Sequence, residues 1–207
     1  MKLKYILWIA LQWILAPCFG AKIRRMVHEQ MAPTMEGRWL DVGCGPRSPA
    51  VRTLPGTLVG VDCVPDMLCE WRCEAIVLAC ATATALPFAS ESFDGVVCFG
   101  LLHHLNEADA ATALVEMQRV ARSGGMVLLL DNVKPSFAAR RPLAALLRLL
   151  DHGHHIRTEE VLRRLLNRHQ FCLGPRFTYS WAGLEGCWAS FIRPEGSPSV
   201  EPQQYLG

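Results

Sequence analysis

Short, mainly apolar runs that end in polar or glycine residues recur along the middle of the chain. Residues 38–42, 58–62, 93–98 and 126–130 are such runs, and turn or helix signals follow each of them. Continuous apolar runs of this length are typical of strands that are buried on both faces of a parallel sheet. The hydrophobic pattern therefore predicts strands that alternate with helices along the chain.

Helix starts can be placed between and after these strands. Asn106 is predicted to cap a helix, because Asp109 follows three positions later and an apolar face runs from Leu114 onward. Pro142 is expected in the first turn of a Leu-rich helix, where its missing N–H costs nothing. Thr158 is predicted to cap a further helix whose first turn is acidic.

Two more strands are predicted near the C-terminus. Residues 171–181 and 187–193, joined by the loop 182–186, have the pattern of a hairpin. Together with five strand–helix units, this predicts an α/β fold. Its seven-stranded sheet is expected to be mostly parallel, with one antiparallel strand near the edge and helices on both faces.

The sequence divides into three parts. Residues 1–35 are predicted to form an apolar and amphipathic helical segment, with a lead-in helix over 22–35. Residues 36–193 carry the α/β pattern and are expected to form one ligand-binding domain. Residues 194–207, rich in Pro, Ser and Gln, are expected to form a loose tail.

A glycine turn follows the first predicted strand, in the sequence Asp41-Val42-Gly43-Cys44-Gly45. Glycine permits a sharp turn and a close approach of a ligand to the backbone. A following helix, predicted to begin near Ser48, would offer unpaired N–H groups to that ligand. A dinucleotide fingerprint requires a third glycine at position 48. Asp41 is poorly placed for a pyrophosphate and well placed for an ammonium group, so S-adenosylmethionine is favoured.

A second acid lies at the end of the next strand. Asp62 ends the apolar run 58–62, about 20 residues after the glycine turn, where a carboxylate can accept both ribose hydroxyls of a nucleoside. Further segments follow in order: Leu86-Pro87-Phe88, Ser92-Phe93-Asp94-Gly95, Leu102-His103-His104-Leu105 and Arg119 to Gly125. In order and spacing these segments resemble the class I S-adenosylmethionine-dependent methyltransferases, especially the type 11 group that includes quinone-biosynthesis C-methyltransferases. The resemblance covers about residues 36–133.

The resemblance implies a Rossmann-like fold, S-adenosylmethionine as cofactor and a methyltransferase activity (EC 2.1.1.-). It also implies a set of cofactor-binding residues: Asp41, Gly43, Cys44, Gly45, Asp62, Cys63, Thr82, Ala83 and Gly100. Two positions depart from the family pattern. Arg47 stands where a third glycine is usual, and Thr82 stands where an acid usually contacts the adenine amino group. A threonine hydroxyl accepts such a bond without the added strength of a charge.

Three histidines are candidates for the group that removes a proton from the methyl acceptor. Because His103 and His104 are adjacent and follow the fourth strand, one should point inward and one away. By resemblance His104 belongs to the cofactor pocket, and His103 is the one that could face the substrate. His155, after the fifth strand, is a further candidate base because that region usually builds the acceptor pocket. A solvated loop is favoured over a metal site for His152, His154 and His155, and we expect no metal.

The charge and the cysteine content are compatible with the predicted fold and function. Basic residues concentrate in segments 1–50 and 132–176 and acidic ones in 51–131, but the net charge is only +2. We expect a small-molecule substrate and no nucleic-acid partner. The nine cysteines are odd in number, and several fall inside apolar runs, which favours reduced thiols in the cytoplasm.

The N-terminal 20 residues allow several interpretations. The apolar run 5–16, with Trp8 and Trp13 and flanking lysines, predicts a helix lying in the inner membrane interface. Basic residues of the segment 134–148, namely Lys134, Arg140, Arg141 and Arg148, would then face anionic headgroups. A secretory signal or a lid over the active site would explain the same run.

The leading hypothesis is a methyltransferase that acts on a small, apolar or lipid-like acceptor. A catalytically silent, methyltransferase-fold binding subunit remains open because of Arg47 and Thr82. A nucleotide-dependent oxidoreductase is disfavoured by Asp41 and by Ser48 in place of the third glycine. The acceptor atom and the oligomeric state are not predicted.

Overall fold

A computed structural model describes residues 37–46, 56–69, 76–135, 142–150, 153–180 and 182–196, together with positions 21, 25, 27, 29, 50 and 54. The membrane-interface prediction for residues 1–20, the helix start near Ser48, the departure at Arg47 and the tail beyond 196 lie outside these residues. Positions 25, 27 and 29, which fall inside the predicted lead-in helix 22–35, are helical, and so is position 21.

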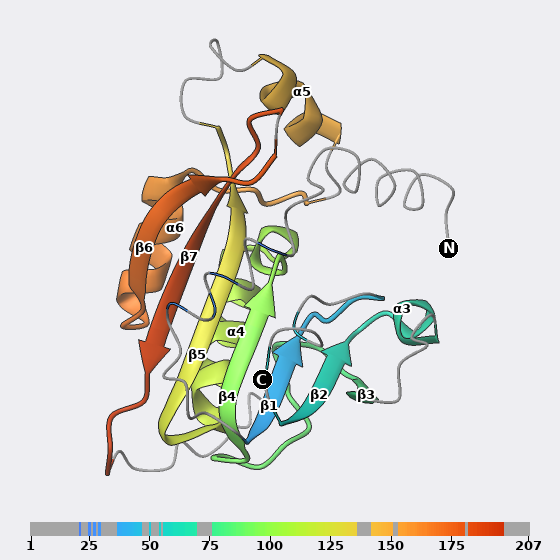
Figure 1. Cartoon of the computed structure of the whole chain (residues 1–207), viewed down its shortest axis with the longest axis vertical. Coiled ribbons are helices and arrows are strands. Elements are labelled where there is room, and N and C mark those ends of the chain that lie inside the picture. The colour runs from blue at the N-terminus through green and yellow to red at the C-terminus, as the bar shows by residue number, and fades with distance from the viewer. Residues whose placement is uncertain are drawn as a thin grey trace.

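Seven strands form one sheet in the order β3-β2-β1-β4-β5-β7-β6. The strands are β1 (Arg38–Val42), β2 (Thr57–Asp62), β3 (Ile76–Cys80), β4 (Phe93–Phe99), β5 (Ala121–Val133), β6 (Cys172–Thr178) and β7 (Glu185–Ile192). Only β7 runs antiparallel to the others, between β5 and β6. Figure 1 shows β7 beside β5, pointing the opposite way. The predicted sheet, including its inserted antiparallel strand, is confirmed.

Each face of the sheet carries its own apolar core. On one face, Leu40, Val96 and Leu129 pack with residues of α4 (Glu107–Val120) and α6 (Glu159–Arg168). On the other face, Trp39 and Val97 pack with Val27, which is helical and fully buried. Neighbouring strand residues alternate between the two cores, as the period of two in a strand requires. Helices therefore contribute to both faces.

The predicted helix caps are present. The side chain of Asn106 accepts a hydrogen bond from Asp109 N, and that of Thr158 accepts one from Val161 N. Pro142 begins α5 (Pro142–Leu150). Two short helices complete the described part: α3 (Pro65–Cys69) and the 3₁₀ turn η2 (Leu102–His104).

Strand β5 is longer than the sequence indicates. Gly124 and Gly125 resemble a turn that precedes the strand, but β5 starts at Ala121, which pairs with Phe93. The register shifts between Phe93 and Gly95, and Gly124 has a φ of +73°. These glycines therefore form an irregularity inside the strand, as glycines at β-bulges do.

No helix among the residues that the structure describes is long and apolar enough to cross a bilayer.

Candidate active site

The glycine turn leaves β1 at the carboxyl edge of the sheet. Gly43 and Gly45 adopt φ values of +74° and +53°, and residues that carry a Cβ rarely adopt such values. The N–H groups of Gly43 and Cys44 both donate to Val61 O, at 2.8 and 3.0 Å. The turn is therefore anchored to the end of β2.

The two glycines face different surroundings. A Cβ at Gly43 would approach the Leu101 side chain to 3.0 Å, so the turn packs closely against the segment that follows β4. A Cβ at Gly45 would have nothing within 4 Å. The space where a Cβ would stand at Gly45 is therefore unfilled, which allows a close approach to the turn at its Cα atom.

Asp62 ties the end of β2 to this turn. Its carboxylate accepts hydrogen bonds from Gly45 N and from Val64 N, each at 3.0 Å and each through a different oxygen. An ionised carboxylate has about four acceptor sites. Both oxygens therefore keep capacity for ribose hydroxyls while they hold the two loops in place.

Asp41 and Cys44 are more deeply buried than a solvent-facing pocket would place them. Asp41 is 1% exposed and Cys44 is 4% exposed. Burial raises the pKa of the neighbouring Cys98 thiol well above its ordinary value, and the charges of Asp131 and Asp41 add to this rise. Asp41 on β1 and Asp131 on β5 are thus buried acidic groups near the carboxyl ends of their strands.

Three further predicted cofactor-binding residues, among them Thr82 at the adenine position of the family pattern, lie after β2 and β3. Cys63 and Thr82 are exposed, and Ala83 is buried. The Thr82 and Thr84 hydroxyls are 2.9 Å apart and share a hydrogen bond. Partial burial raises the pKa of the Cys63 thiol, which favours its uncharged form.

His103 forms a buried pair with Asp131. The His103 Nδ1 atom lies 2.6 Å from Asp131 Oδ1, and the two residues are equally buried, at 4% exposure. Asp131 follows the apolar run 126–130 of β5, and η2 begins three residues after β4 ends. This arrangement of a histidine held by a buried carboxylate is the one that orients catalytic bases.

His104 points away from the core, as one of the two adjacent histidines was expected to do. It is exposed, and its ring centroid lies 4.2 Å from that of His103. Gly100 is also near the buried ring, since a Cβ there would come within 3.6 Å of His103 Cε1. The Gly100 N–H donates to Leu130 O of β5 at 2.7 Å, so the predicted cofactor-binding residue Gly100 and the buried histidine both adjoin the end of β5.

Arg157 fixes the turn that carries both histidines. Its guanidinium donates to Leu102 O at 2.7 Å and to Leu105 O at 2.8 Å. The backbone N–H of His155 donates to His103 O at 2.9 Å. The segment after α5 is therefore part of the support of His103.

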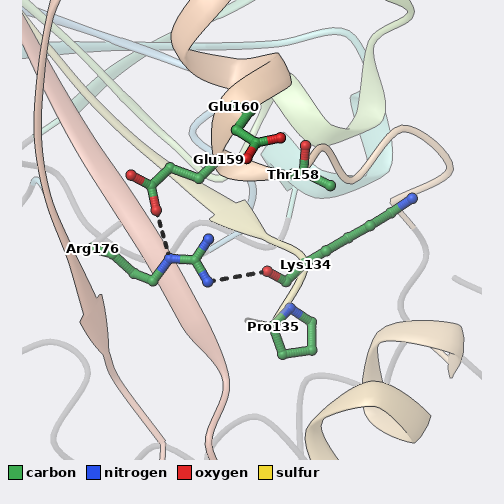
Figure 2. A pocket seen from close by; sticks show the side chains of 6 residues that line it. All are labelled: Lys134, Pro135, Thr158, Glu159, Glu160 and Arg176. Carbon is green, nitrogen blue, oxygen red and sulfur yellow. Dashed lines mark hydrogen bonds and ion pairs between the residues drawn. The ribbon is translucent and has the colours of Figure 1, made fainter. Parts of the chain in front are cut away.

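Two cavities of about 340 Å³ each lie beyond the carboxyl end of β5 and share Lys134 and Thr158. One is lined by Lys134, Pro135, Thr158, Glu159, Glu160 and Arg176 (Figure 2). Arg176 crosses it, donating to Glu159 Oε2 at 2.9 Å and to Lys134 O at 3.4 Å. His155 and His154 line the other cavity, in the region predicted to build the acceptor pocket. The glycine turn lines neither cavity.

One sequence prediction is wrong. Arg148 does not face solvent, because it is 8% exposed and its Nη2 donates to Tyr179 Oη and to Glu185 O, each at 2.8 Å. It belongs to the interior of the site region and is not available to lipid headgroups. Lys134 is exposed as expected, and Arg140 and Arg141 lie outside the described residues.

Sequence reasoning missed Asp131, Asn132, Arg157 and Tyr179. A signal existed for the first two, since a polar pair directly after the apolar run 126–130 marks the carboxyl end of a buried strand. The other two are isolated polar residues whose contacts are made by chain segments far apart in sequence.

The fold and this edge of the sheet define a nucleoside-binding protein of the Rossmann-like class. A glycine turn after β1 and an acid after β2 meet a polar cluster after β4 and β5. Comparison with known proteins then identifies the family.

The methyltransferase domain family matches residues 40–129. A demethylmenaquinone methyltransferase from Roseiflexus castenholzii is 35% identical over 139 residues, which are 63% of this chain and 53% of that protein. The chain thus spans about half of that relative's length. YcgJ from Bacillus subtilis, an uncharacterized methyltransferase, is 30% identical over 182 residues, which are 83% of this chain and 70% of that protein.

A solved structure shows the same fold. It is a Thermotoga maritima S-adenosylmethionine-dependent methyltransferase, described as a possible histamine N-methyltransferase, with a TM-score of 0.72 and 17% identity. The match covers 91% of this chain and 96% of that one. The chain belongs to the class I S-adenosylmethionine-dependent methyltransferases, in the type 11 domain family. S-adenosylmethionine is the cofactor of this family, as predicted.

Proposed function

We propose that this chain transfers a methyl group from S-adenosylmethionine to a small acceptor with a phenolic or quinol ring and an apolar chain. The Roseiflexus relative named demethylmenaquinone methyltransferase supports this acceptor class. The apolar run over residues 5–16 supports it independently, since an apolar acceptor resides in or near a membrane.

The cofactor is assigned to the turn at the ends of β1 and β2. The space beside the Gly45 Cα atom takes the amino acid portion, and Asp62 accepts the ribose hydroxyls through its remaining lone pairs. Asp41 supplies negative charge beneath the ammonium group. Cys63, Thr82 and Ala83 border the adenine, with Cys44 and Gly100 completing the pocket.

The His103–Asp131 pair carries the chemical assignment. With Asp131 as acceptor, His103 holds its proton on Nδ1 and offers Nε2 as the proton acceptor. When bound, S-adenosylmethionine supplies the methyl group, whose bond to sulfur breaks as its bond to the acceptor atom forms. The proton of the acceptor hydroxyl passes to His103 Nε2, and Asp131 stabilises the imidazolium that results. Gly43, packed on Leu101, keeps the cofactor turn and this histidine in one rigid unit.

The decisive assay uses S-adenosylmethionine labelled in its methyl group with a panel of quinols and phenols of increasing chain length. We expect labelled product for ring acceptors with an apolar chain. His103→Ala should lower kcat by about 10²-fold or more while S-adenosylhomocysteine still binds. The same substitution at His104 or at His155 is the matched control, since both are exposed predicted bases. If the His104→Ala or His155→Ala variant loses kcat while His103→Ala keeps it, the base is His104 or His155 and not His103.

The silent binding subunit is tested by the same experiment. If the chain binds S-adenosylhomocysteine and no acceptor of the panel is labelled, the methyl-transfer proposal is wrong for this acceptor class. Residues 1–20 are tested separately with a chain that lacks them. If they lie on the membrane, the truncated chain stops sedimenting with anionic vesicles and still methylates a water-soluble acceptor. If they form a lid, it loses acceptor binding.

A further inference from the structure

A row of hydrogen-bonded side chains runs from His103 to Arg148. His103 Nε2 lies 3.4 Å from Asn132 Nδ2, and the Asn132 Oδ1 atom accepts a hydrogen bond from Tyr179 Oη at 2.9 Å. Tyr179 Oη in turn accepts one from Arg148 Nη2 at 2.8 Å. Tyr179 and Arg148 are buried, at 3% and 8% exposure. The row joins η2, β5, the segment after β6 and helix α5.

Arg148 sets the direction of the whole row. A guanidinium can only donate hydrogen bonds, so the Tyr179 oxygen is an acceptor toward Arg148. The hydroxyl of Tyr179 donates its proton to Asn132 Oδ1. With its oxygen so engaged, the Asn132 amide can present only its NH₂ group to His103. By donating to the Tyr179 oxygen, the cation favours the arrangement in which the hydroxyl proton points away from Arg148 and toward Asn132.

Asn132 at Nε2 and Asp131 at Nδ1 favour the same tautomer of His103. An NH₂ group requires an acceptor, so His103 Nε2 must carry a lone pair. The ring proton is then on Nδ1, where the Asp131 carboxylate accepts it at 2.6 Å. A reversed Asn132 would require a proton on Nε2 and would leave a lone pair on Nδ1 facing the negative charge of Asp131.

We propose that Arg148, Tyr179 and Asn132 are positioning residues that hold His103 as the neutral Nδ1–H tautomer, with Nε2 ready to accept a proton. This rests on the proposed role of His103 as the base. The 3.4 Å link between Asn132 and Nε2 is the longest of the row, so an acceptor hydroxyl can take its place without breaking the rest. Glu185 O, a second acceptor for Arg148 Nη2 at 2.8 Å, keeps the guanidinium in position.

The tautomer can be read directly by NMR of the full-length chain with isotope-labelled histidine nitrogens. In the unaltered protein we expect His103 to show a protonated Nδ1 and an unprotonated Nε2. Tyr179→Phe keeps the ring and removes the hydroxyl, so Asn132 is free to reverse and the preference for Nδ1–H should weaken. Asn132→Asp places a carboxylate beside Nε2, which should gain a proton. His169, the C-cap residue of α6, is the internal reference and should not change in either variant.

Kinetics complete the test. Asn132→Asp should lower kcat by about 10²-fold, as loss of a general base does, and Tyr179→Phe by a smaller factor, both with unchanged affinity for S-adenosylhomocysteine. An unchanged His103 tautomer in both folded variants would overturn the proposal, as would a changed tautomer with an unchanged kcat. The NMR measurement needs neither cofactor nor acceptor. If the chain proves to have no methyltransferase activity, the proposed function fails while the tautomer still decides whether the row directs His103.

Discussion

Gly153→Ala should dislodge His103 from its place beside Asp131. A Cβ at position 153 would lie 2.1 Å from His103 Cδ2 and 3.1 Å from His103 Cγ, far inside normal contact distance. The His103 ring cannot move away freely, because it is buried and its Nδ1 is hydrogen-bonded to Asp131 Oδ1 at 2.6 Å. Overpacking of this kind costs about 1–3 kcal/mol of unfolding free energy. For a protein of this size each kcal/mol lowers Tm by about 2–4 °C.

The cause can be isolated with a double-mutant cycle. His103→Ala removes the imidazole ring, including the Cγ and Cδ2 atoms that face Gly153, and leaves only the backbone His103 O at 3.1 Å from the added Cβ. In that background Gly153→Ala should cost less than about 1 kcal/mol, because the ring clash is absent, Gly153 is outside the positive-φ region and alanine restricts the unfolded chain. Urea unfolding of the four proteins then gives the coupling energy. An equal cost of Gly153→Ala in both backgrounds would refute the assigned contact.

Three further predictions concern Arg157, Glu159 and Cys187. Arg157→Met should lower the unfolding free energy by about 2–4 kcal/mol in urea, because two backbone carbonyls lose a charged donor; a change below 0.5 kcal/mol, the typical surface effect, would contradict it. A hydrogen bond from Arg163 lowers the pKa of Glu159, so the carboxylate stabilises the fold above its unfolded-state pKa of about 4.3 and this contribution is lost as pH falls through the lower folded-state value. Glu159→Gln should therefore be less stable than the parent at pH 7 by about 0.5–1 kcal/mol and equal to it near pH 2, and a difference that persists in acid would count against the ion pairs. Burial raises the pKa of Cys187 to about 11, so native-state alkylation at pH 8, followed by mass spectrometry, should modify exposed Cys69 at least about 10-fold faster; comparable rates would show that the Cys187 site opens.

The sequence was sufficient for the sheet because each strand is a local signal. The apolar run before Gly43 and the one before Asp62 each ends at a polar or glycine residue, and parallel strands bring those ends to one edge. The antiparallel β7 was predictable because its hairpin is local as well. Strand β5 was predicted too short because Gly124 and Gly125 give the same signal for a turn and for a bulge.

The candidate site was less predictable because its bonds join distant segments. His103 was singled out by its place after β4, but its partner Asp131 is 28 residues away. Arg148 resembles a surface residue of a basic segment, yet it is paired with Tyr179 across 31 residues. No periodicity in either segment encodes these contacts, since they depend on how α5 and the segment after β6 pack on β5.

Calorimetric titration with S-adenosylhomocysteine decides whether the turn at Gly43–Gly45 and the acid Asp62 bind S-adenosylmethionine. We expect one ligand per chain, with affinity reduced about 5- to 150-fold in Asp62→Ala, because charge-assisted hydrogen bonds of about 1–3 kcal/mol are lost. Asp66→Ala, an exposed acid on the neighbouring α3, should bind like the parent. Equal affinity of the Asp62→Ala chain and the parent, or binding of a nicotinamide dinucleotide in place of S-adenosylhomocysteine, would contradict the account.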